Sequence, residues 1–102
     1  MANTNDITRI PEHQSTNITA SGAVAGAGSL LWGVQLVGGS AATTLTVYDN
    51  TSAAGTIVFQ AAVPIGTSQF CDITDLGPLK CYIGMYASLA GAGGSAQLFW
   101  DA

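Results

Sequence analysis

Few side chains in this sequence have the types and spacing that catalysis requires. The only histidine, His13, lies in a polar N-terminal segment, whereas a serine–histidine–aspartate relay needs a histidine held between two partners in a rigid site. Asp72 and Asp75 could act as an acid–base pair, but they stand beside Gly77-Pro78, where carboxylates commonly keep a loop solvated. The sequence therefore predicts a protein that is not an enzyme.

The sequence also offers poor ligands for metals and cofactors. Cys71 and Cys81 match no zinc or redox spacing, and we expect two reduced, buried thiols. The turn at 49–52 provides oxygen atoms but lacks the alternating acids of a calcium-binding loop. The glycine-rich stretches 22–28 and 91–94 lack the Lys-Ser/Thr pair of a phosphate-binding loop. We expect neither a metal nor a cofactor.

The shortage of charged residues is the most informative property of the composition. Asp, Glu, Lys and Arg make up 8% of the 102 residues, against about 25% in an ordinary soluble domain. Such a surface suits permanent contact with other protein, although a plain Thr/Ser-rich β surface is an alternative explanation. Arg9 and Lys80 are the only cations and the net charge is −4. We therefore expect neither nucleic acid nor a membrane as a partner, because both interactions rely on clustered positive charge.

Residues 1–16 and 17–102 differ in composition and predict two regions. The first is polar, contains Pro11, and lacks the basic start and apolar stretch of a signal peptide. We expect it to be an extended arm on a protein made in the cytoplasm. Its apolar side chains, Ile7 and Ile10, could insert into a neighbouring molecule; the alternative is a disordered tail. The second region predicts one β domain.

The β domain is predicted from short apolar or alternating runs separated by Gly, Asn, Asp, Ser and Pro, the pattern of an antiparallel sandwich. No segment has the period of a helix. Gly38-Gly39 is expected to turn the chain with positive φ. The runs predict strands near residues 18–24, 29–37, 42–49, 56–60, 68–73, 79–86 and 95–100.

Alternation within these runs assigns each side chain to a face of the sandwich. Tyr48, Tyr82 and Tyr86 fall on outer faces. Tyrosine combines apolar area with a polar tip, so outward tyrosines favour a contact surface; the alternative is that they line the rim of the core. The side chains expected to point inward are Leu30, Trp32, Val34, Leu36, Leu45, Val47, Leu79, Cys81, Ile83, Met85, Leu98 and Trp100.

Several segments resemble small virion proteins of tailed bacteriophages. They are LWGVQL at 31–36, TLTVYDNTS at 44–52, GT at 55–56 and PLKCYI at 78–83, and the likeness extends from Ser21 to the C-terminus. This resemblance implies a jelly-roll-like β-sandwich that decorates or cements a capsid, often as a trimer. Lys80-Cys81 departs from the family pattern, because such proteins usually carry plain apolar strand residues there.

Two hypotheses about function follow. The first is a virion structural protein on the capsid surface, made in the host cytoplasm, whose partners are copies of itself in a trimer and the major capsid protein or another virion protein. Its partner-binding residues would be Ile7, Ile10, Tyr48, Tyr82 and Tyr86. The alternative is a carbohydrate-binding or adhesin-type module of a fibre or tail, in which the three tyrosines stack on sugar rings.

Overall fold

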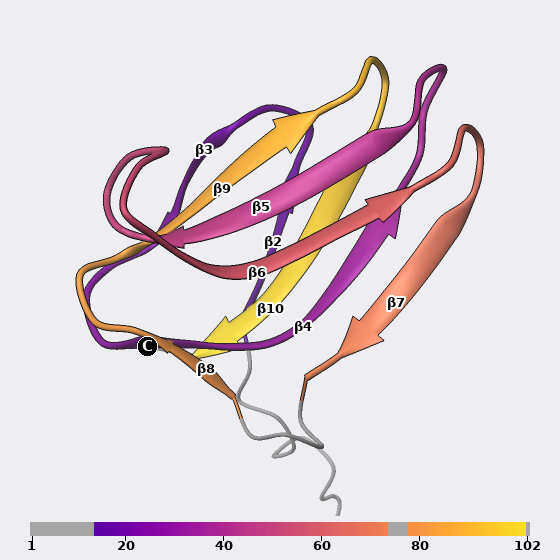
Figure 1. Ribbon diagram of the computed structural model, residues 1–102. Helices are drawn as coiled ribbons and strands as arrows, with labels where there is room; N and C mark the ends of the chain where they lie inside the picture. Colours follow the sequence, from indigo (N-terminus) through magenta and orange to yellow (C-terminus); the bar gives the residue numbers. More distant parts are fainter. Residues whose placement is uncertain (1–13, 74–77, 102) are drawn as a thin grey trace, which may run out of the picture.

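The computed structural model describes residues 14–73 and 78–101, which form two antiparallel sheets packed face to face (Figure 1). The described residues contain no helix, and so no helical membrane span. The all-β sandwich predicted from the sequence is confirmed. The strands are β2 (Gln14–Ile18), β3 (Gly22–Ala25), β4 (Ser29–Val37), β5 (Thr43–Asp49), β6 (Thr56–Val63), β7 (Ser68–Asp72), β8 (Leu79–Cys81), β9 (Met85–Ala90) and β10 (Ser95–Asp101).

The order of the strands is that of a jelly roll. One sheet has the order β2-β10-β4-β7, with the short β8 pairing with β4 beyond the end of β7, and the other has the order β3-β9-β5-β6. If the eight longer strands are lettered B to I in chain order, the sheets become B-I-D-G and C-H-E-F. This is the double-sheet arrangement found in viral capsid domains, lectins and cupins.

Three predicted segments are divided or bounded differently in the structure, and the strand predicted at 56–60 continues to Val63. The predicted strand at 18–24 is two strands on different sheets, because the chain crosses between the sheets after Ile18. The predicted strand at 79–86 is likewise divided, into β8 and β9. The predicted arm extends too far, since Gln14 and Thr16 pair with Trp100 and Leu98 as part of an edge strand. The rest of the arm lies outside the described residues.

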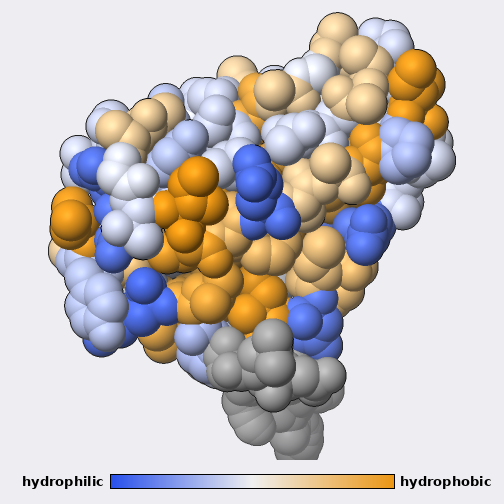
Figure 2. Space-filling view, in the orientation of Figure 1, coloured by the Kyte–Doolittle hydropathy of each residue, from blue (hydrophilic) through white to orange (hydrophobic). Residues whose placement is uncertain are grey.

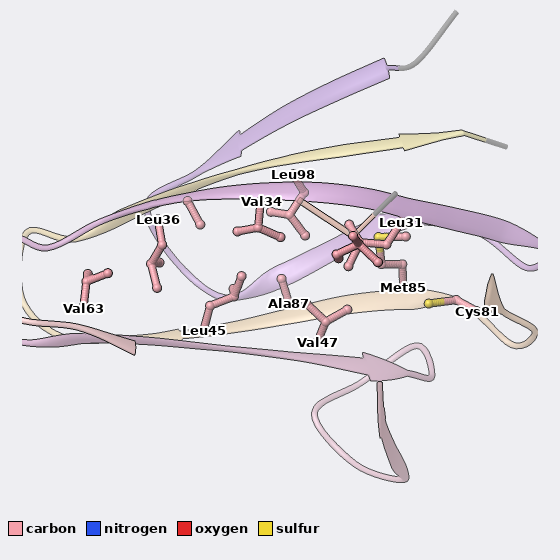
Figure 3. Packing of buried hydrophobic residues seen from close by; sticks show 12 residues of the cluster. Leu31, Val34, Leu36, Leu45, Val47, Val63, Cys81, Met85, Ala87 and Leu98 are labelled. Carbon is pink, nitrogen blue, oxygen red and sulfur yellow. The ribbon is translucent and has the colours of Figure 1, made fainter. Parts of the chain in front are cut away.

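The core lies between the two sheets and is apolar. Figure 3 shows Val34, Leu36 and Leu98 extending from the five-stranded sheet toward Leu45 and Val47 of the other. These side chains are fully buried, which confirms their predicted faces. The buried hydrophobic residues are Leu31, Val34, Leu36, Leu45, Val47, Val63, Ile73, Cys81, Met85, Ala87, Ala96 and Leu98.

A β-bulge in β4 makes the predicted faces of Leu30 and Trp32 wrong. Gly33 pairs with Phe99 of β10, and Leu31 pairs with Trp100, so that Trp32 is the extra residue of the bulge. The extra residue shifts the alternation of inward and outward side chains by one position, so that Leu31, and not Leu30 or Trp32, enters the core. The Trp32 side chain instead donates its indole N–H to Oδ2 of Asp101 at 2.7 Å.

Candidate binding surfaces

The structure brings two of the three predicted tyrosines together. Tyr48 of β5 and Tyr86 of β9 are register partners on the outer face of the four-stranded sheet, and both are half-buried. Tyr82 is not part of this pair: it lies in the loop after β8, is 70% exposed, and has the Lys80 Nζ atom 5.4 Å from its ring centre. Ile7 and Ile10 lie outside the described residues.

Asp49 fixes the loop that carries Tyr82 and Ile83. Its Oδ1 atom accepts the backbone N–H of Ile83 at 2.7 Å and that of Gly84 at 3.4 Å. The hydrogen bond from Ile83 is the main reason that the pKa of Asp49 lies below its ordinary value. Ile83 is 58% exposed, so its predicted inward orientation is wrong: the strand ends at Cys81 and the chain turns toward Asp49.

All charged side chains of the described residues lie toward one end of the sandwich. Asp49, Asp72 and Asp101 are the last residues of β5, β7 and β10, and Lys80 pairs with Leu30, as Asp101 also does. We call this end, with the loops β3–β4, β5–β6 and β8–β9, the charged end. The opposite end carries only uncharged residues, and the charges are therefore segregated along the strands.

We call the opposite end the glycine end; it consists of the loops 19–21, 38–42, 64–67 and 91–94. Its most exposed large side chain is Ile65, at 63%. In Figure 2 the tip formed by the loops β4–β5, β6–β7 and β9–β10 is pale, tan or orange, whereas deep blue residues occur lower on the same face. The glycine end thus presents small neutral side chains and backbone.

Backbone hydrogen bonds join three loops of the glycine end. Gly38 donates to the carbonyl oxygen of Thr67 at 2.7 Å, and Gly66 donates to that of Gly39 at 3.1 Å. Ser40 donates its backbone N–H to the carbonyl oxygen of Ala92 at 3.0 Å. The β4–β5 loop is therefore bonded to both of its neighbours, and these hydrogen bonds restrain the three loops.

Close approach of backbone explains the glycines at this end. A Cβ atom at Gly39 would collide with the backbone of Gly93, and one at Gly38 would collide with the carbonyl oxygen of Pro64. Neither Gly38 nor Gly39 is among the glycines of positive φ, so the predicted reason for this pair is wrong. At this end positive φ occurs instead at Gly66 (66°), Gly91 (116°) and Gly93 (74°).

A third surface, the outer face of the five-stranded sheet, was not identified from the sequence. The register places Asn17, Gln97, Gln35 and Phe70 side by side across β2, β10, β4 and β7. We call these four residues the amide row. Alternation alone places Gln35 and Gln97 outward, but only the register shows that they are neighbours.

Of the groups considered for chemistry, the structure describes Asp72 and both cysteines. Cys71 and Cys81 are free thiols. Burial, and to a lesser extent the negative charge of Asp49, raises the pKa of Cys81 to about 11, so this thiol is a poor nucleophile. His13 and Asp75 lie outside the described residues, and among those described no group of acidic, histidine and cysteine side chains has the arrangement of a metal site.

Comparison of the chain with protein-family models, curated proteins and solved structures finds no match.

Proposed function

We propose that this chain is a non-enzymatic structural subunit of a virion, a decoration or cement protein that binds the surface of a phage head as a homotrimer. The jelly roll is compatible with this function but does not decide it, since one fold hosts many functions. The observation that carries the proposal is the segregation of charge, which leaves a rigid, neutral glycine end available for contact with a protein shell.

The glycine end has the physical properties of a docking surface. Cores of protein interfaces are depleted in charged residues, because a buried charge without a partner is costly. The hydrogen bonds from Gly38, Ser40 and Gly66 already order the loops, so binding costs little further backbone entropy. Ile65, in the β6–β7 loop, adds an exposed apolar side chain to this neutral surface.

The N-terminal arm would provide a second attachment. The segment that precedes Gln14 joins the sandwich at the charged end, where Gln14 pairs with Trp100. In our proposal Ile7 and Ile10 insert into a neighbouring protein while the arm pairs with an exposed strand edge. Contacts through opposite ends of one subunit would bridge two neighbours, which is what a cement protein requires.

Cosedimentation with phage heads tests the proposal. The chain is expected in purified particles of the phage that encodes it, and light scattering should give three times the 10.3 kDa mass of one chain. Ile57, near the start of β6, and Ile65, in the loop that follows β6, make a matched pair, since Ile57 is 50% and Ile65 is 63% exposed. Ile65→Asp should abolish binding to heads, and Ile57→Asp should leave it intact.

Each part of the proposal has an outcome that would refute it. Absence of the chain from purified particles would refute a virion function. Equal occupancy of the Ile65→Asp and Ile57→Asp variants would exclude the glycine end as the attachment surface. Deletion of residues 1–12 without any loss of occupancy would show that the arm is not required.

A further inference from the structure

We infer that the amide row binds neutral polysaccharide, an activity distinct from attachment to a shell. The row crosses four strands, which are spaced about 4.8 Å apart, so Asn17 and Phe70 are roughly 14 Å from each other. A glycan lying across the strands would meet one of these side chains at each strand. This surface therefore has the length and shape to hold an extended oligosaccharide.

The three amides have hydrogen-bonding capacity to spare. Asn17 is exposed, Gln35 and Gln97 are partly exposed, and no side-chain hydrogen bond of these three residues occurs within the described part of the chain. Each amide carries a carbonyl oxygen that accepts and an NH₂ group that donates twice. Vicinal sugar hydroxyls offer the complementary donors and acceptors. The row thus presents unused groups that match a glycan.

Phe70 supplies the apolar part of the site. Its side chain is 52% exposed, and its ring lies at 63° to that of Phe99 with 6.0 Å between the ring centres. Gly33 lies beneath the ring: a Cβ atom there would stand 3.2 Å from Cζ of Phe70. Because Phe99 and Gly33 fix the ring before any ligand arrives, stacking of its open face on sugar C–H groups requires little ordering.

The distribution of charge selects neutral ligands. The four residues of the row are uncharged, and Asp72, which pairs with Gly33, stands in the neighbouring row. The chain also carries a net charge of −4, which disfavours binding of an acidic polysaccharide. The row also lies on the face of a sheet, between the glycine end and the charged end, so a glycan could bind while either end is engaged.

Affinity electrophoresis of the full chain tests the inference. The gels would contain dextran, galactomannan, xyloglucan or hydroxyethylcellulose as neutral probes, and alginate as an acidic probe. We expect retardation by at least one neutral polysaccharide and none by alginate. Phe70→Ala and Gln97→Met should each raise the dissociation constant roughly tenfold, the ratio that corresponds to ~1.4 kcal/mol. Ile57→Ala, a change of an exposed apolar residue on β6 of the other sheet, should leave it unchanged.

Three outcomes would overturn the inference. The first is a lack of retardation by every neutral probe, and the second is retardation that persists in both Phe70→Ala and Gln97→Met. The third is dissociation of the oligomer by Phe70→Ala, which would assign this face to contact between copies of the chain. Thermal unfolding checks that each variant is folded. If Phe70→Ala does not fold, Gln97→Met still tests the inference. The residues under test in the glycan assay differ from those in the cosedimentation assay. Failure of the proposed attachment to phage heads would therefore not affect the glycan result.

Discussion

Three glycine-to-alanine substitutions can separate steric crowding from backbone conformation at the glycine end. At Gly39 the new Cβ would collide with the backbone of Gly93, although the φ of Gly39 is not in the left-handed region. At Gly66 the Cβ would have no heavy atom within 4 Å, but φ is 66°. At Gly22 neither obstacle exists. The three positions therefore test the two causes one at a time.

The expected costs differ in size. Crowding by backbone atoms cannot be relieved by rotating a side chain, so Gly39→Ala should lose about 1–3 kcal/mol or more. Gly66→Ala should lose about 1–2 kcal/mol, the cost of a left-handed conformation for a residue with a Cβ atom. Gly22→Ala should be neutral or gain about 0.4–1 kcal/mol, because alanine restricts the unfolded chain.

Thermal unfolding followed by circular dichroism measures these differences. For a domain of this size 1 kcal/mol shifts Tm by about 4–8 °C, so a loss of ~2 kcal/mol in Gly39→Ala corresponds to roughly 10 °C. Urea titrations should show the same order of midpoints at a constant slope. Equal Tm values for Gly39→Ala and Gly22→Ala would refute the close packing of the β4–β5 and β9–β10 loops, and with it the rigidity on which the docking proposal depends.

Three further predictions concern other parts of the molecule. The pKa of Cys81 is about 11 in the folded protein, against an ordinary value of 9.0; because the unfolded chain loses this proton first, stability should fall between about pH 9 and pH 11, by up to ~3 kcal/mol. Urea titrations across this pH range should show that Cys81→Ala, although less stable, lacks this decline in the free energy of unfolding. An identical decline in the variant would show that Cys81 is not its cause. Thr16→Val removes the acceptor of the Trp100 indole N–H, at 3.0 Å, and should cost about 1 kcal/mol in thermal unfolding, whereas the same change at exposed Thr19 should cost less; equal effects would argue against the pairing of β2 with β10. Asp49→Ala should speed hydrogen exchange at the amide of Ile83, relative to the amide of Leu89, which Ser21 Oγ holds at 2.9 Å; unchanged exchange at Ile83 would show that the carboxylate does not fix this loop.

Local sequence patterns predicted much of the fold. The strand at 29–37 was located correctly, and the one at 42–49 to within a residue, because alternation with a period of two is a property of neighbouring residues. The same pattern correctly placed Leu45, Val47 and Leu98 in the core. The shortage of charge also comes from composition alone.

Long-range contacts decided what the alternation could not. The bulge at Trp32 depends on the pairing of β4 with β10, and such pairings join residues far apart in the sequence. Likewise the turn that exposes Ile83 depends on a carboxylate on another strand, that of Asp49. A period of two cannot reveal either feature, so the predicted faces of Leu30, Trp32 and Ile83 were wrong.

The candidate surfaces show the same division. The sequence by itself determined that the chain has few charges, outward amides at Gln35 and Gln97, and loops rich in glycine. Only the tertiary structure decided that the charges of the described residues gather at one end, that the amides align with Phe70, and that Gly39 must lack a side chain. The physical reason is that strand register and the packing of loops are set by contacts across the two sheets, whereas the direction of a side chain is set by its own strand.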